Sequence, residues 1–418
     1  MKLPMMFLAV LVSVMACSAE APDATTRVGP ALPTLAQAGT AEIDAYLREA
    51  TADGRVPKAV AMVANAEGVV YQGAFGKRDV AANIDVKMDA IFNLASMTKP
   101  ITSVATMMLY EAGAFDLDDP VSMYLPELGG RKVVTSIDEA ARTYATEPAK
   151  SEITIRQLLA NASGLAYNFA NPTMQALVDI TGAELMDLPL VSHPGTKWNY
   201  SGGTAVLATL VAKISGMPYD EFLRTRIFEP LGMVDTFYAV PADKRNRVVT
   251  IHSLVDGQLV ETPTPETVRS TVRGDGGLNG TAADYIRFLR MLLNDGELDG
   301  TRLLSAASVE AMRSNQIGTI NVETQVSTNP ARSADFPVGA GRDKFGLGFQ
   351  ITASNTHNPD LRAPGSYTWA GIYNTHFWGD PERGIVAVIL MQQLPFYGPN
   401  VMRVYQGFEE RVNRNLNH

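Results

Sequence analysis

Cysteine and histidine are scarce in this chain, which has one cysteine and five histidines among 418 residues. A single cysteine cannot form an internal disulfide, and it cannot supply the thiolate pairs that zinc sites and redox centres need. The histidines are scattered and lack the spacing of a metal-binding helix motif. These absences argue against a metalloenzyme, and we expect neither a metal nor another cofactor.

Basic residues are also fewer than acidic residues. Lysine and arginine together number 35 against 44 aspartates and glutamates, and the formal net charge is -9. Nucleic acid is not an expected partner, because binding to its phosphate backbone needs clustered basic residues and this chain has an excess of acidic ones. The expected partner is a small-molecule substrate. Hydrophobic residues make up 46% of the chain, which is typical of a globular protein. The length exceeds one ordinary core and predicts two lobes.

The lone cysteine, Cys17, follows a short apolar run over residues 5–15 that is too short to span a bilayer. The run ends in Val14-Met15-Ala16-Cys17, which resembles the lipobox of bacterial lipoproteins, where the cysteine becomes the lipid-bearing first residue. An ordinary secretory signal with an incidental cysteine is the alternative. Both interpretations predict export to the periplasm. The lipoprotein interpretation predicts an outer-membrane anchor, since Ser18 is not the aspartate that retains lipoproteins at the inner membrane.

The remaining chain divides into a tether and a folded part. Residues 18–39 are rich in Ala, Pro and Thr without helical periodicity, and we expect a flexible tether after the signal peptide of residues 1–17. Strand-like runs lie near both ends of the folded part, 40–418, and mainly helical patterns lie between them. This order predicts a sheet-rich lobe built from 40–92 and 340–418, with a helical lobe inserted over about 93–339.

The expected fold class is α/β, more specifically α+β: an antiparallel sheet flanked by terminal helices, plus the inserted helical lobe. Because the strands do not alternate with helices, a doubly wound sheet is excluded. The periodicity predicts helices over 40–53, 97–113, 155–159, 204–215, 219–227, 282–294 and 401–414, strands over 59–65, 69–75, 346–351, 367–378 and 384–392, and a long loop over 315–342.

The search for a catalytic nucleophile leads to Ser96-Met97-Thr98-Lys99, at the start of a predicted helix. No serine lies in the Gly-x-Ser-x-Gly setting of the α/β-hydrolases. Residues i and i+3 share a helix face, so the Lys99 amine can reach the Ser96 hydroxyl, and the helix N-terminus stabilises a developing alkoxide. A partly buried lysine with a lowered pKa can act as a base. The alternative is a plain helix cap at Ser96 and a solvated Lys99.

Two further segments give this tetrapeptide a context. Tyr200 lies in a turn-rich, glycine-bracketed stretch before the helix predicted at 204, where the backbone can hold it free to meet a substrate. A buried ring with its hydroxyl on a backbone carbonyl is the alternative. Trp369-Ala370-Gly371-Ile372 lies at the start of a predicted strand. Its small residues allow close approach of a ligand and leave a backbone N–H to bind an oxyanion.

Taken together, Ser96-x-x-Lys99, Tyr200-Ser201 and the small-Gly strand resemble the serine β-lactamase and penicillin-binding-protein superfamily, over about 40–414. Within it the chain looks most like the class C β-lactamase-like branch, and there like the family VIII carboxylesterases. Those esterases carry Trp-Gly-Gly or a close relative where β-lactamases have Lys-Thr-Gly, and Trp369-Ala370-Gly371 matches that substitution.

The resemblance implies roles for particular residues. Ser96 would be the acylated nucleophile, and Lys99 and Tyr200 would together take its proton and return it to the leaving group. The backbone N–H groups of Ser96 and Ile372 would form the oxyanion hole. The implied activity is that of a serine carboxylic ester hydrolase acting on short-to-medium acyl esters.

Two departures from the family pattern bear on the substrate. Tyr200-Ser201-Gly202 lacks the asparagine of Tyr-x-Asn, and the lysine of Lys-Thr-Gly is absent. Losing a charge-assisted contact costs about 1.5–3 kcal/mol. The departures therefore favour neutral esters, without forbidding weak β-lactam turnover. The alternatives are a class C-like β-lactamase or D-amino-acid peptidase, and a non-catalytic penicillin-binding-like protein that binds cell-wall fragments.

Aromatic residues near these motifs are expected to line a substrate pocket, with core packing as the alternative interpretation. The expected pocket residues are Tyr167, Phe169, Trp369, Ala370, Gly371 and Tyr373. His376 falls on the same predicted strand as Trp369, but a histidine there is more typical of a packed residue than of a Ser-His-Asp triad.

Overall fold

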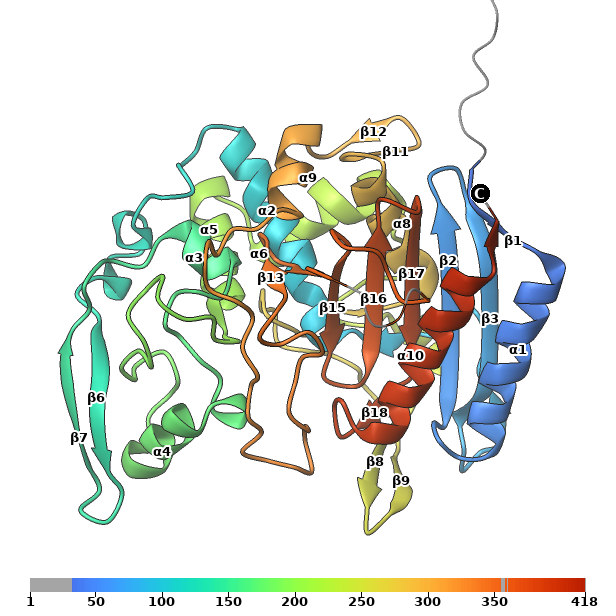
Figure 1. Cartoon of the computed structure of the whole chain (residues 1–418), viewed down its shortest axis with the longest axis horizontal. Helices are drawn as coiled ribbons and strands as arrows, with labels where there is room; N and C mark the ends of the chain where they lie inside the picture. Colours follow the sequence, from blue (N-terminus) through green and yellow to red (C-terminus); the bar gives the residue numbers. More distant parts are fainter. Residues whose placement is uncertain (1–31, 355–357, 359, 418) are drawn as a thin grey trace, which may run out of the picture. The chain divides into compact units, whose positions relative to one another are not determined.

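The computed structural model describes residues 32–354, 358 and 360–417 (Figure 1). Cys17 and the segment expected to be a signal peptide lie outside these residues. Part of the segment expected to be a tether is folded instead, because β1 (Thr34–Leu35) pairs antiparallel with β19 (Leu416–Asn417) near the end of the chain. Within the described residues, no helix has the length and apolar character that crossing a membrane requires.

An eight-stranded antiparallel sheet forms the centre of the molecule, in the order β13-β14-β15-β16-β17-β2-β3-β4. This confirms the predicted antiparallel sheet built from both ends of the chain. Its strands are β2 (Lys58–Asn65), β3 (Val69–Asp79), β4 (Ile84–Asp85), β13 (Lys344–Phe345), β14 (Gln350–Ile351), β15 (Tyr367–Gly371), β16 (Thr375–Asp380) and β17 (Ile385–Leu390). Strands β2 and β17 are buried along their whole length because both faces of the sheet are covered.

The terminal helices α1 (Gln37–Ala52) and α10 (Pro399–Arg414) cover one face of the sheet, as Figure 1 shows. Successive residues of a strand point to opposite faces, so Ala59, Ala61 and Val63 of β2 pack toward these two helices. The residues between them, Val60 and Met62, pack into the larger core on the other face.

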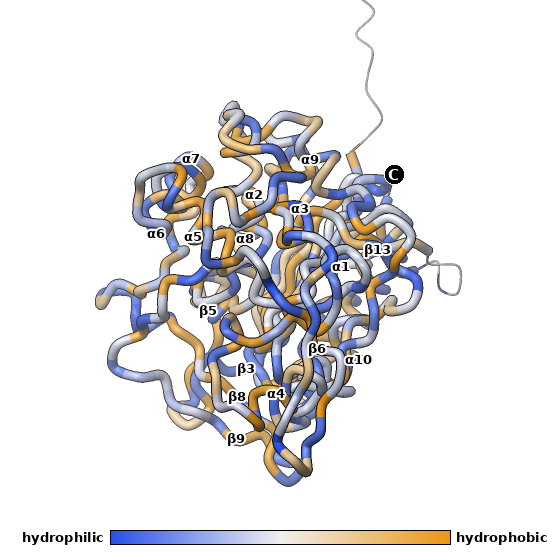
Figure 2. Tube along the Cα trace, turned by 90° about the vertical axis from the view of Figure 1, so that its left-hand side faces the viewer, coloured by the Kyte–Doolittle hydropathy of each residue, from blue (hydrophilic) through white to orange (hydrophobic). Residues whose placement is uncertain are grey.

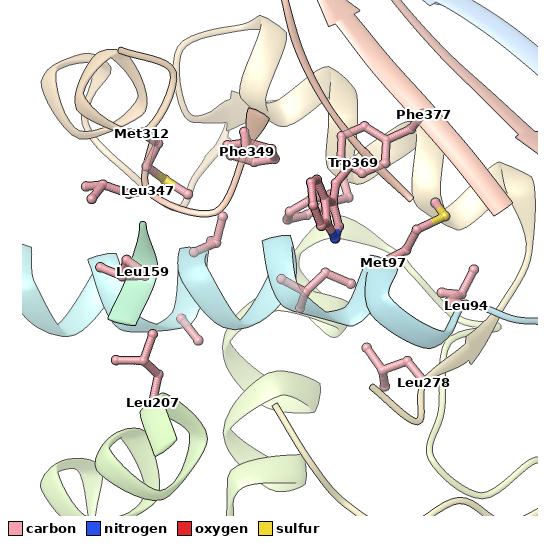
Figure 3. Close-up of a cluster of buried hydrophobic side chains, with 14 of the residues drawn as sticks. Leu94, Met97, Leu159, Leu207, Leu278, Met312, Leu347, Phe349, Trp369 and Phe377 are labelled. Atoms are coloured by element: carbon pink, nitrogen blue, oxygen red, sulfur yellow. The ribbon is translucent and has the colours of Figure 1, made fainter. Parts of the chain in front are cut away.

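That larger core holds α2 (Thr98–Glu111), α5 (Gly203–Ser215) and α8 (Ala282–Leu293), of which α8 packs directly on β2 and β17. Every residue of helix α2 from Thr98 to Met107 is buried. Lys99 is the only charged residue in this stretch, so the helix has no polar face that requires contact with solvent. Figure 3 shows part of the cluster of apolar side chains packed around α2.

Two predicted strands differ from the observed ones. The run 367–378 forms β15 and β16, joined by a hairpin in which Asn374 takes a φ of 57°. The run 346–351 contributes only β14, which pairs with β13 just before it. The strands in both runs are buried on both faces, so no regular alternation of exposed and buried residues reveals where a strand ends.

Several elements of the middle section were not predicted, because they are short or lie exposed with weak apolar periodicity. They are the hairpin β6 (Lys132–Asp138) and β7 (Thr143–Pro148), helix α4 (Pro172–Thr181), the hairpin β8 (Ile251–Val255) and β9 (Gln258–Thr262), and helix α9 (Ala306–Met312). Both Figure 1 and Figure 2 show the β8–β9 hairpin at the lower end of the molecule.

The remaining elements are short. The helix predicted over 219–227 is shorter and passes into a wider π-type turn at Arg224–Phe228. The other short elements are α3 (Ile155–Leu159), α6 (Tyr219–Leu223), α7 (Glu229–Leu231), β5 (Phe92–Asn93), β10 (Asn279–Gly280), β11 (Glu297–Leu298), β12 (Thr301–Arg302) and β18 (Gln393–Leu394).

Candidate active site

Ser96 lies in a single 3₁₀ turn, Ala95–Met97, that leads directly into α2. The preceding backbone is fixed by the pairing of β5 with β10 and by a 2.8 Å hydrogen bond from the Leu94 amide to the Leu278 carbonyl. Ala95 takes a φ of 47°, a left-handed conformation that is uncommon for a residue with a Cβ and recurs at functional sites. The turn leaves Ser96 partly exposed on the wall of a 260 Å³ cavity, the active-site cavity.

Lys99 is one helical turn further on and is only 2% exposed. Its Nζ donates hydrogen bonds to the Tyr167 hydroxyl at 2.8 Å and to the Asp275 carbonyl at 3.1 Å. Burial lowers the pKa of the Lys99 amine to about 8, against the opposing effect of the Asp275 carboxylate and with a further contribution from Arg273. The amine is therefore neutral in a substantial fraction of molecules at mildly alkaline pH.

Tyr200 is held by its backbone in the buried loop before α5. Its amide donates to the Gln325 Oε1 at 3.0 Å, and its carbonyl accepts from the Tyr167 amide at 3.1 Å. Burial raises the pKa of the Tyr200 phenol above its usual value, and a side-chain hydrogen bond with Ser96 opposes that rise. The phenol therefore stays protonated at neutral pH, in contact with the predicted nucleophile.

Asp275 is part of the same cluster, although sequence reasoning missed it. The Tyr167 hydroxyl donates to its Oδ2, and Arg273 makes two hydrogen bonds to its carboxylate at 2.8 and 2.6 Å. Burial by itself would raise the pKa of the Asp275 carboxyl, but Lys99, Arg273 and Tyr167 hold it at about 2. The available signal was the Arg-Gly-Asp-Gly-Gly sequence over 273–277, which puts a charged pair into a glycine-rich turn.

Strand β15 ends beside the segment that carries Ser96. A Cβ at Gly371 would lie 2.3 Å from the Leu94 carbonyl oxygen and 2.3 Å from the Thr375 Oγ1. The sequence predicted that a ligand would approach the strand here, but the closely packed group is the Leu94 backbone. Ile372, the next residue, lines the active-site cavity together with Ser96. The two residues expected to form the oxyanion hole thus share one cavity.

The expected pocket residues divide into two groups. Tyr167, Phe169 and Tyr373 line the active-site cavity. Trp369, Ala370 and Gly371 are buried and do not line it. The Trp369 ring lies 5.0 Å from the Tyr200 ring and packs in the core shown in Figure 3. The difference arises because β15 is buried along its whole length, so a strand residue next to the site need not face it.

His376 lies outside the wall of the active-site cavity. It belongs to β16, and its ring stacks on Tyr405 of α10 with the centroids 4.4 Å apart. Burial, together with the charge of Arg362, lowers the pKa of its imidazole to about 3. Within residues 32–354, 358 and 360–417, no group of three or more His, Cys, Asp or Glu side chains could hold a metal ion.

Comparison with known proteins places the chain in a family. The family model described as Beta-lactamase matches residues 43–409. Protein Rv1367c of Mycobacterium tuberculosis is 34% identical over 368 residues, covering 84% of this chain and 89% of that protein. Esterase EstB of Burkholderia gladioli is 27% identical over 392 residues, with 84% and 89% coverage. A mutant of the simvastatin synthase LovD from Aspergillus terreus superposes with a TM-score of 0.77 at 25% identity, covering 90% of this chain and 95% of that one.

The fold and these matches define the class of protein as β-lactamase/transpeptidase-like. The chain belongs to the Beta-lactamase family. The esterase among its relatives agrees with the resemblance to family VIII carboxylesterases, and at the level of the family it supports a serine hydrolase that cleaves esters.

Proposed function

We propose that this protein is a carboxylesterase that cleaves short-to-medium acyl esters through an acyl-enzyme on Ser96. The observation that carries the proposal is the arrangement of three groups. Ser96 faces a cavity, the Tyr200 phenol interacts with the Ser96 side chain, and the Lys99 amine lies 5.1 Å from the centre of the Tyr200 ring. This is a nucleophile with a general-base system within reach.

In the proposed acylation step, Ser96 Oγ forms a bond to the ester carbonyl carbon while its proton leaves toward Tyr200 and Lys99. Tyr200 keeps its proton at neutral pH, so Lys99, with a pKa of about 8, is the group that supplies a neutral base. The backbone N–H groups of Ser96 and Ile372 stabilise the oxyanion. As the bond between carbonyl carbon and alcohol oxygen breaks, the proton returns to that oxygen and the alcohol leaves.

Deacylation repeats the same proton transfers with water. Water attacks the acyl carbon, its proton passes to the Lys99 and Tyr200 pair, and the proton finally returns to Ser96 Oγ as the carboxylic acid leaves. The size of the active-site cavity, 260 Å³, suits an acyl group of short to medium length. Ser270 lines this cavity and a neighbouring one of 520 Å³, which offers room for a longer substrate.

The test is a chain-length series of 4-nitrophenyl esters, assayed in parallel with nitrocefin against the wild type, Ser96→Ala and Ser215→Ala. Ser215 is a partly buried serine at the end of α5 and serves as the matched control. We expect ester hydrolysis in the wild type and in Ser215→Ala, and its loss in Ser96→Ala. Full activity in Ser96→Ala would refute the mechanism.

The same assays separate the alternatives. Fast nitrocefin hydrolysis with negligible ester turnover would favour a class C-like β-lactamase, and cleavage of D-amino-acid peptides would favour a peptidase. If a fluorophosphonate probe failed to label Ser96, a non-catalytic protein that binds cell-wall fragments would be the better description.

We also propose that the chain is exported to the periplasm and anchored in the outer membrane through a lipid on Cys17. The support is the Val14-Met15-Ala16-Cys17 sequence. Labelled palmitate should be incorporated into the wild type and not into Cys17→Ala. A label that persists in Cys17→Ala would contradict lipidation at this residue.

A further inference from the structure

The active-site cavity contains an arginine without an acidic partner. Arg332 lines this cavity together with Ser96, and its side chain is exposed. Across the described residues, 32–354, 358 and 360–417, its guanidinium forms no ion pair and no side-chain hydrogen bond. The acid closest to it in sequence, Asp335, accepts a hydrogen bond from the Ser327 amide instead. The charge of Arg332 is therefore available to a ligand.

The fold holds Arg332 in place from both sides. Its amide donates to the Asn329 carbonyl at 2.9 Å, and its carbonyl accepts from the Phe396 amide at 3.0 Å. Its guanidinium carbon lies 5.6 Å from the centre of the Phe169 ring, and that ring lies 5.3 Å from the ring of Tyr167. A cation over an aromatic face is held in position while its N–H groups stay free to bind. The positive charge is thus fixed on the wall that Phe169 and Tyr167 form.

The other charges on the cavity wall cancel each other. The charged residues that line the active-site cavity are Arg273, Asp275 and Arg332. Arg273 is ion-paired with Asp275 at 2.6 Å, which leaves Arg332 as the uncompensated charge. A protonated Lys99 behind the wall adds positive and not negative charge. On a chain with a net charge of -9, this cavity is a local positive site that attracts an anion.

We propose that Arg332 binds a carboxylate carried by the ester substrate, so that the enzyme prefers esters bearing one negative charge. This inference rests on the proposed function, because it concerns the ester cleaved at Ser96. A guanidinium offers paired N–H groups that match the two oxygens of a carboxylate. The sequence favoured neutral esters because the lysine of Lys-Thr-Gly is absent. Arg332 supplies a positive charge from a different segment, the loop between α9 and β13.

The test uses two pairs of esters matched in size. In the first pair the carboxylate is in the acyl half: mono-4-nitrophenyl glutarate against 4-nitrophenyl valerate. In the second pair it is in the alcohol half: 4-(butanoyloxy)benzoate against 4-methylphenyl butanoate. We expect Arg332→Gln to lower the ratio of kcat/KM for the charged over the neutral ester by about tenfold in one of the pairs, mainly through KM. We expect Arg332→Lys, which keeps the charge, to retain much of that ratio.

Arg403→Gln is the matched control, since Arg403 is an exposed arginine on α10 that does not line the cavity. It should leave both ratios at the wild-type value. An Arg332→Gln variant whose ratios equal those of the wild type in both pairs would overturn the inference.

A binding measurement separates this inference from the proposed function. Titration calorimetry on Ser96→Ala, with and without Arg332→Gln, gives the Kd of each ester without turnover. A charge-selective loss of binding on this background supports Arg332 even if the wild type cleaves none of these esters and the proposed function fails. Equal Kd values for the charged esters in the two proteins would refute the role of Arg332 whatever the activity.

Discussion

The Lys99 amine donates a hydrogen bond of 2.8 Å to the hydroxyl of Tyr167, a residue 68 positions away in the chain. The Tyr167 hydroxyl in turn donates a hydrogen bond to the Asp275 carboxylate. The proposed base is therefore coupled to the ion pair between the buried Asp275 carboxylate and the exposed Arg273 guanidinium. This coupling makes the protonation of Lys99 sensitive to two charged side chains that do not touch Ser96 in the proposed mechanism.

Changing the two members of that ion pair should move the pH profile in opposite directions. The Asp275 carboxylate raises the pKa of Lys99 and Arg273 lowers it. If activity needs the neutral amine, kcat/KM of the wild type rises with pH, with a midpoint near 8. Asp275→Asn should shift this acidic limb to lower pH and Arg273→Gln should shift it to higher pH, each by about one pH unit. If both variants keep the wild-type midpoint, the limb does not report the ionisation of Lys99.

Removing only the hydroxyl of Tyr200 should abolish most of the activity and leave the packing intact. The ring of Tyr200 packs 5.0 Å from Trp369 and 5.1 Å from Tyr167, and Tyr200→Phe keeps these contacts. Losing a general acid–base group typically lowers the rate by about 10²–10⁴-fold. We expect a fall in kcat of this size with little change in KM or Tm, measured by ester kinetics and thermal unfolding. A loss of activity that follows a large drop in Tm would instead indicate a structural role.

The proposed nucleophile and its neighbours could be predicted from the sequence, whereas the hydrogen-bond network around them could not. Ser96 and Lys99 are three residues apart, so helix geometry relates them directly, and the resemblance to a known superfamily added Tyr200. The contact between Tyr167 and Asp275 joins residues 108 positions apart, and no local sequence pattern relates the two. Gln325, which holds the Tyr200 amide, lies in a segment whose sequence indicated only a loop.

The central sheet, too, could be predicted from the sequence only in part. Its antiparallel character and its terminal helices followed from the order of the apolar runs along the chain. The turn between β15 and β16 did not, because both strands are buried on both faces and their burial does not alternate. For the same reason Trp369 was expected on the cavity wall and is found in the core behind Tyr200.

A second buried lysine should make the stability of the protein depend on pH. Lys58 is fully buried in β2, and its Nζ donates to the Thr250 carbonyl at 2.8 Å. Burial lowers the pKa of its amine from 10.5 to about 7, against the opposing charges of Glu261 and Asp79. Between pH 7 and pH 10 the unfolded chain therefore binds one more proton at this site, so the free energy of unfolding rises with pH. The slope for one proton is at most about 1.4 kcal/mol per pH unit.

Urea unfolding at pH 7, 8 and 9 tests this expectation. The wild type should gain stability over this range, and Lys58→Met should show a clearly smaller slope because this site no longer titrates. In this variant the free energy of unfolding should still rise slightly with pH, because the pKa of Lys99 is also lowered and Lys99 still titrates. Equal slopes in the two proteins would mean that Lys58 has an ordinary pKa in the folded state.

The contact between β15 and the backbone before Ser96 should be intolerant of a methyl group. A Cβ at Gly371 would lie 2.3 Å from the Leu94 carbonyl oxygen, so Gly371→Ala must push the strand away from the turn that carries Ser96. This displacement would move the Ile372 amide out of the proposed oxyanion hole. Removing one such donor typically lowers kcat by about 10²–10³-fold.

The matched control is Gly68→Ala, in the turn between β2 and β3, where a Cβ would meet no atom within 4 Å. Its ester kinetics and Tm should stay near those of the wild type. Circular dichroism and Tm would show whether Gly371→Ala still folds, and any folded protein should then show reduced kcat. A folded Gly371→Ala enzyme with wild-type kcat would mean either that the strand accommodates the methyl group without moving or that the Ile372 amide does not stabilise the oxyanion.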